Sequence, residues 1–156
     1  KERDYSRAST NAKQDNIVKV SLLGSVEGKT VFMADDMIGT GGTLLRAMRI
    51  LKEQGAARII CAVSLPYFSG NAQDTFEEAY REGLFYRIIG TNAVYHDKGL
   101  LTREWYLSAD VTNLFARSLY RLHANRSLSS LLDNREIIKD LLDRSRGEGP
   151  QKELKL

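Results

Sequence analysis

The 156-residue sequence has little cysteine and no apolar run long enough to cross a membrane. Its one cysteine, Cys61, lies within an apolar run, so a disulfide framework is excluded and a reducing compartment, the cytoplasm, is favoured. No apolar run approaches the roughly 18 residues of a membrane helix, and no signal peptide is visible. We therefore expect a cytoplasmic protein without a membrane partner.

A strong charge of one sign is also missing. The net charge is +3, and no block of lysine or arginine exceeds two residues, so the sequence gives no case for nucleic-acid binding. The apolar content of 42% and the charged content of 28% are ordinary for one soluble globular domain of this length. The first residue is lysine rather than methionine, so we expect the chain to be a piece of a longer protein.

The hydrophobic pattern predicts an α/β domain over residues 17–132, preceded by a mobile basic arm over 1–16 and followed by an extra helix and a disordered tail over 133–156. Apolar runs predict strands, and apolar residues at helical spacing predict helices between them. The expected strands are 17–23, 30–34, 58–64, 84–89 and 105–108; the expected helices are 44–53, 72–81, 110–122 and 133–142. This alternation predicts an open, mostly parallel sheet flanked by helices, with ligands at the carboxyl ends of the strands.

One stretch combines an apolar strand, an acidic pair, a glycine and threonine loop and the start of a helix. Small residues and a helix N-terminus present backbone N–H groups to an anion. The acidic pair would repel a phosphate directly beside it, so it suits hydroxyl groups or a cation. The pattern therefore predicts a ligand with a phosphate at one end and diol oxygens at the other, such as a sugar phosphate. The residues concerned are Asp35, Asp36, Gly39, Thr40, Gly41, Gly42 and Thr43.

This stretch resembles the phosphoribosyl-diphosphate binding motif, and further matches follow one another along the chain. Together they resemble the carboxyl half of ribose-phosphate pyrophosphokinase (phosphoribosyl pyrophosphate synthetase) over roughly residues 1 to 132. The matching segments are 1–3, 23–30, 35–43, 51–56, 68–72, 90–92, 120–123 and 127–129.

The resemblance implies a type I phosphoribosyltransferase-like fold and an enzyme that uses Mg2+ to transfer diphosphate from ATP to ribose 5-phosphate. It implies that residues 39–43 hold the 5-phosphate and that Asp35 and Asp36 contact the ribose hydroxyls. Lys1 and Arg3 match basic catalytic residues of a loop that closes over the transferring phosphates, which suits phosphoryl-type chemistry. Ser127 and Ser129 match a regulatory phosphate-binding site between subunits of a homo-oligomer.

The sequence also departs from the family. Gly39 stands where the family usually has an acidic residue, and Glu2 stands where it often has a basic one. Nothing in the chain matches the amino half, which supplies the metal-binding histidine and aspartate and much of the ATP pocket, so we expect the chain alone to be inactive. Two alternatives remain open: a salvage phosphoribosyltransferase, for which no base-recognition segment is seen, and a non-catalytic regulatory module.

The remaining candidate residues have structural interpretations. We expect Cys61 in the core, His96 exposed in an irregular loop, and His123 at a helix end, where it favours the helix dipole. Trp105 and the Tyr67–Phe68 pair are expected to serve packing, although Tyr67 follows a strand near the predicted cleft.

Overall fold

The computed structural model describes residues 24–147. The arm over 1–16 and the predicted strand over 17–23 lie outside the described residues, as does the end of the predicted tail. The elements follow one another as β1 (Thr30–Ile38), α1 (Gly42–Glu53), β2 (Arg58–Pro66), α2 (Ala72–Arg81), β3 (Arg87–Thr91), α3 (Lys98–Leu101), β4 (Tyr106–Ala109), α4 (Thr112–His123), α5 (Ser129–Leu132) and α6 (Arg135–Ser145).

The four strands form one parallel sheet in which the order in space follows the order in the chain, β1-β2-β3-β4. In this register Met33 lies opposite Cys61, which in turn lies opposite Ile88. Because all strands run the same way, their carboxyl ends share one edge of the sheet. The predicted open parallel α/β sheet is confirmed.

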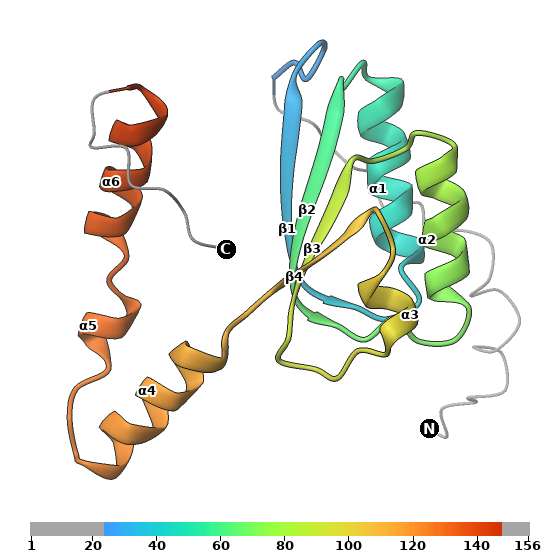
Figure 1. Cartoon of the computed structure of the whole chain (residues 1–156). Helices are drawn as coiled ribbons and strands as arrows, with labels where there is room; N and C mark the ends of the chain where they lie inside the picture. Colours follow the sequence, from blue (N-terminus) through green and yellow to red (C-terminus); the bar gives the residue numbers. More distant parts are fainter. Residues whose placement is uncertain (1–23, 148–156) are drawn as a thin grey trace, which may run out of the picture.

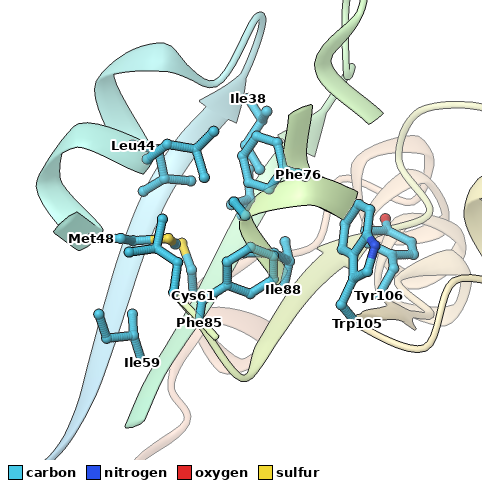
Figure 2. Close-up of a cluster of buried hydrophobic side chains, with 14 of the residues drawn as sticks. Ile38, Leu44, Met48, Ile59, Cys61, Phe76, Phe85, Ile88, Trp105 and Tyr106 are labelled. Atoms are coloured by element: carbon cyan, nitrogen blue, oxygen red, sulfur yellow. The ribbon is translucent and has the colours of Figure 1, made fainter. Parts of the chain in front are cut away.

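Two helices cover one face of this sheet, as Figure 1 shows for α1 and α2. Their buried side chains recur at helical spacing and meet the inward side chains of the strands, which alternate along β2. Figure 2 shows this core, in which the side chains of Met48, Cys61, Phe76 and Ile88 gather between the helices and the sheet. Trp105 and Tyr106 extend the same core towards β4.

Each of these two helices ends at a glycine, as the sequence predicts. Gly55 follows α1 at φ 87°, a left-handed conformation that glycine adopts without a steric penalty. Its N–H donates to the carbonyl of Lys52, and the N–H of Ala56 donates to that of Leu51, which together form a Schellman motif. The chain turns at this point and enters β2. Gly83 follows α2 with the same pair of bonds.

The other face of the sheet is uncovered within residues 24–147. Phe32 and Leu107 have 63% and 56% of their surface exposed on β1 and β4. A continuous apolar run such as that of β1 is typical of a strand covered on both faces, but within residues 24–147 only one face is covered. The segment α4–α6 lies on this side, but it runs away from the sheet and contributes no buried residue (Figure 1).

Several predicted boundaries change in the structure. The first described strand runs on to Ile38, because its backbone continues to pair with β2 as far as Pro66. Strand β3 begins only at Arg87. The short helices α3 and α5 lie in stretches where the sequence predicts no helix. Helix α6 begins at Arg135 rather than at residue 133, and Asp133 before it accepts a hydrogen bond from the N–H of Arg135.

Candidate functional site

The predicted acidic pair lies within β1, two and three residues before its last residue, Ile38, rather than at the end of the strand. Both carboxylates are exposed, and Oδ1 of Asp35 accepts a hydrogen bond of 2.8 Å from the N–H of Asp36. This bond engages one of the four carboxylate oxygens. No hydrogen bond engages the other three oxygens within residues 24–147, so they can accept further bonds.

The loop after β1 leads straight into an uncapped helix N-terminus. Gly41 is the N-cap residue of α1, and no side chain accepts a hydrogen bond from the first turn. The first helical bond runs from the N–H of Leu45 to the carbonyl of Gly41 at 2.9 Å. Gly42 and Thr43 are both exposed, so their N–H groups and the positive end of the helix dipole face solvent. Such an end binds an anion well.

The threonines add hydroxyl donors beside these amides. Thr40 and Thr43 are exposed, and neither hydroxyl forms a hydrogen bond within residues 24–147. The structure thus brings the predicted phosphate-binding residues 39–43 into one short turn at the carboxyl edge of the sheet. Their role in binding stays a prediction.

Two neighbouring loops are tied to the same edge. The N–H groups of Phe68 and Ser69 donate to the carbonyls of Ile38 and Gly39, at 3.1 and 3.0 Å, which joins the loop after β2 to the loop after β1. From β3, the hydroxyl of Thr91 donates to the carbonyl of Ser64 at 2.5 Å. The segments at the carboxyl ends of β1, β2 and β3, where the sequence predicts the ligand, are therefore linked by hydrogen bonds.

A polar network joins the ends of β3 and β4 to the start of α4. The side-chain N–H of Asn92 donates to Oδ1 of Asp110 at 2.8 Å, and its amide oxygen accepts from the N–H of Val111 at 2.9 Å. Asp110 also accepts from the N–H of Thr112 at 2.8 Å, at the start of α4. Bonds from Thr112 and Asn92 lower the pKa of the Asp110 carboxyl below its usual value. Beside this network Val111, Phe115 and Leu119 line an apolar hollow of about 420 Å³.

His96 is not the exposed loop residue that the sequence predicts. Its ring is half-buried, and its Nε2 lies 3.1 Å from the carbonyl oxygen of Thr91 and 2.9 Å from the hydroxyl of Tyr106. The sequence around His96 does not predict these contacts, because Thr91 and Tyr106 belong to strands β3 and β4 and are brought to His96 by the fold. His123, by contrast, ends α4 as expected.

The cysteine and two of the aromatic residues serve packing, as predicted. Cys61 is fully buried, and burial, followed by the charge of Asp35, raises the pKa of its thiol to about 11. A thiol with this pKa stays protonated at neutral pH and is no nucleophile. Trp105 and Phe68 are buried in the aromatic core. Tyr67, in the loop after β2, is 53% exposed.

The predicted regulatory serines lie together. The Ser127 hydroxyl donates to the Ser129 hydroxyl at 3.0 Å, and Nη1 of Arg121 donates to the Ser127 carbonyl at 2.8 Å. A guanidinium beside two hydroxyls suits an anion, but nothing in the structure tests a regulatory role. Lys1 and Arg3, the predicted catalytic residues, lie outside the described residues.

The described residues do not supply a metal cage of their own. Among residues 24–147 no three His, Cys, Asp or Glu side chains converge on a point where an ion could bind. Mg2+ is commonly held by one or two carboxylates together with substrate phosphates, so Asp35 and Asp36 do not by themselves define its site. No described helix has the length and apolarity needed to cross a membrane.

Comparison with known proteins places this geometry in context. The sequence profile described as "Phosphoribosyl transferase domain" matches residues 1–97. The chain is 34% identical over 116 residues to a ribose-phosphate pyrophosphokinase of Prochlorococcus marinus (strain MIT 9313), with 72% of this chain and 32% of the relative covered. It is 35% identical over 119 residues to ribose-phosphate pyrophosphokinase 4 of Saccharomyces cerevisiae, with 76% and 34% covered.

Among solved structures, the chain is similar to phosphoribosylpyrophosphate synthetase from Mycobacterium smegmatis. The TM-score is 0.59 at 28% identity, over 66% of this chain and 33% of that one. The chain thus spans about a third of the length of the relatives that it matches. The likeness covers both sequence and fold.

Proposed function

This chain belongs to the phosphoribosyl transferase domain family, and we propose that it forms the ribose-5-phosphate-binding part of a ribose-phosphate pyrophosphokinase. Such an enzyme transfers diphosphate from ATP to the 1-hydroxyl of ribose 5-phosphate. The observation that carries the proposal is the uncapped N-terminus of α1, placed directly after an exposed acidic pair on β1. Similarity to pyrophosphokinases from bacteria and yeast supports this assignment.

The two halves of the site match the two ends of the ligand. The N–H groups of Gly42 and Thr43 and the hydroxyls of Thr40 and Thr43 would donate to the 5-phosphate, which carries the negative charge that a helix N-terminus favours. The carboxylates of Asp35 and Asp36 would accept hydrogen bonds from the ribose hydroxyls. Carboxylates next to the phosphate itself would repel it, so this division sets the direction of the bound sugar phosphate along β1.

The chain's own contribution to the reaction is binding and orientation. Holding the pentose by both ends fixes the position of its 1-hydroxyl, and positioning is a large part of catalysis in phosphoryl-type transfer. The metal-binding histidine and aspartate that the family resemblance implies have no match in this sequence. We therefore propose that the 156-residue chain binds ribose 5-phosphate but forms no phosphoribosyl diphosphate by itself. We also propose a homo-oligomeric partner of the same chain, as the resemblance implies.

Calorimetric titration with ribose 5-phosphate tests the proposal. Thr40→Val removes one hydrogen bond to a charged group, so we expect affinity to fall about 10- to 100-fold. Asp36→Ala should weaken binding about fivefold or more, because it removes an acceptor for a ribose hydroxyl. Thr30→Val is a matched control for Thr40→Val, because Thr30 is also an exposed threonine but lies at the start of β1, away from the loop after Ile38. Wild-type affinity in both site variants would contradict the proposal.

Product analysis separates the proposed enzyme from a salvage phosphoribosyltransferase. Incubation of the chain with phosphoribosyl diphosphate and each common nucleobase should yield no nucleotide. Incubation with ATP, Mg2+ and ribose 5-phosphate should yield no phosphoribosyl diphosphate. Nucleotide formation would favour the salvage activity, and phosphoribosyl diphosphate formation would contradict the inactivity of the isolated chain.

A further inference from the structure

We propose that Phe68 is a positioning residue that fixes the orientation of the anion-binding amides in the loop after β1. This inference rests on the proposed function, since it assigns a role in the same site. It was not accessible from the sequence, where the residue is only a packing aromatic. Three features of the structure support it: the backbone conformation of Phe68, the two hydrogen bonds formed there, and the packing of its ring.

The backbone of Phe68 is held in an unfavourable conformation. Its φ angle is 47°, in the left-handed region that a bulky side chain rarely occupies. Such a conformation persists only where the surrounding structure holds it, and residues of this kind cluster at functional sites. Here the side chain holds it, because the residue is only 5% exposed and its ring packs against Phe76, Trp105 and Tyr106 at centroid distances of 5.3, 5.7 and 5.8 Å.

This conformation directs two N–H groups at the start of the anion-binding loop. The N–H of Phe68 donates to the carbonyl of Ile38, and the N–H of Ser69 donates to the carbonyl of Gly39. In a trans peptide the C=O and the following N–H point in opposite directions. Bonds that draw these two carbonyls towards residues 68 and 69 therefore turn the N–H groups of Gly39 and Thr40 away from them, towards the open side of the loop.

The other end of the loop rests on the same aromatic pair. Gly41 has φ 77°, and a Cβ at this position would collide with the ring of Phe76. Phe76 is fully buried and meets the Phe68 ring edge to face. The loop is thus held at Ile38–Gly39 by the backbone of Phe68 and Ser69, and at Gly41 by the ring of Phe76. Thr40 stands exposed between these two supports.

A purely structural role for Phe68 makes a different prediction, and Phe85 provides the matched control. Phe85 is equally buried, at 4% exposure, and its ring also contacts Phe76 and Trp105, at 5.8 and 6.0 Å. It lies before β3 and forms no hydrogen bond to the loop after β1. Truncation of either residue should reduce stability, but only truncation of Phe68 should alter the anion site.

The experiment compares the full 156-residue chain with Phe68→Ala, Phe68→Leu and Phe85→Ala. Ribose 5-phosphate affinity is measured by calorimetry, and amide resonances and hydrogen exchange of residues 39–43 are measured by NMR without ligand. We expect affinity to fall about tenfold or more in Phe68→Ala and less in Phe68→Leu, which keeps most of the apolar volume. The resonances of Gly39 and Thr40 should shift in both, whereas Phe85→Ala should keep wild-type affinity within about twofold and wild-type loop resonances.

The outcomes separate this inference from the proposed function. If the wild-type chain binds no ribose 5-phosphate, the proposed function fails, and the NMR comparison still decides whether Phe68 orients the loop. If Phe68→Ala does not fold, Phe68→Leu supplies the result. Unchanged loop resonances and affinity in a folded Phe68 variant, or an equal loss in Phe85→Ala, would overturn the inference.

Discussion

The hydroxyl of Tyr106 lies 2.9 Å from Nε2 of His96, which also lies 3.1 Å from the carbonyl oxygen of Thr91. A carbonyl oxygen only accepts hydrogen bonds, so this geometry favours the tautomer with hydrogen on Nε2. In this tautomer Nε2 donates to the Thr91 carbonyl, and the Tyr106 hydroxyl lies within hydrogen-bond distance of the same nitrogen. A loop histidine thereby joins β3 to β4 near the carboxyl edge of the sheet.

Stability should fall in alkaline solution because of two buried acids. Burial raises the pKa of Tyr106 from 10.0 to about 12, and burial together with the charge of Asp35 raises that of Cys61 from 9.0 to about 11. Both groups bind their protons more tightly in the folded chain. Their contribution to the free energy of unfolding is therefore complete below pH 9. It is lost as pH rises through the pKa values of the folded chain, by up to about 2–3 kcal/mol for each group.

Urea unfolding between pH 8 and pH 11 measures this loss. Tyr106→Phe and Cys61→Ala should each flatten the decline, because neither replacement titrates. Tyr95→Phe is the control, since Tyr95 is 92% exposed, and it should leave the slope unchanged. An alkaline slope that is identical in all three variants would show that other groups cause the decline.

Gly90→Ala should destabilise the carboxyl edge of the sheet. A Cβ at this position would collide with the hydroxyl of Tyr106 and the ring of Pro66, so the variant must displace a buried group. We expect a loss of about 1–3 kcal/mol in unfolding free energy, measured by urea titration. Gly39→Ala is the control, because nothing lies within 4 Å of a Cβ there, and it should change stability by less than about 0.5 kcal/mol. Equal effects of the two substitutions would contradict the packing at Gly90.

Asn92→Ala should loosen the junction between β4 and α4. The amide oxygen of Asn92 accepts from the N–H of Val111, so its removal should speed hydrogen exchange of that amide about tenfold. Asn113→Ala, an exposed substitution on α4, is the control. A Val111 amide that exchanges at the wild-type rate in Asn92→Ala would argue against this network.

The same junction should open in acid. The pKa of Asp110 is lowered in the folded chain, so the stabilisation by its carboxylate is lost as pH falls through the folded value.

Much of the fold could be predicted because it depends on local patterns. Helix α2 has the predicted bounds, since its apolar spacing and the following Gly83 are both encoded within a few residues. The end of β1 could not be predicted in this way. Asp35 and Asp36 have poor strand propensity, and only pairing with a distant strand, Ile38 with Pro66 at its end, extends β1 beyond them.

The candidate site could likewise be predicted only in part. Its residue types and their order indicated an anion-binding loop, because small residues, hydroxyls and a helix start are local features. The support beneath it could not be read from the sequence. The left-handed backbone of Phe68 is enforced by Phe76, Trp105 and Tyr106, which come from other elements. The exposure of α4 likewise depends on tertiary packing, which an amphipathic pattern alone does not determine.

The agreement between strand order in the sheet and strand order in the chain bears on how the protein is made. During synthesis β1 leaves the ribosome first among the described strands, and each later strand finds its only earlier neighbour already exposed. None of the four described strands has to wait for a segment that has not been translated, or to insert between two described strands that have already paired. Assembly can therefore proceed one strand–helix–strand unit at a time, so that each newly made edge is a template for the next strand.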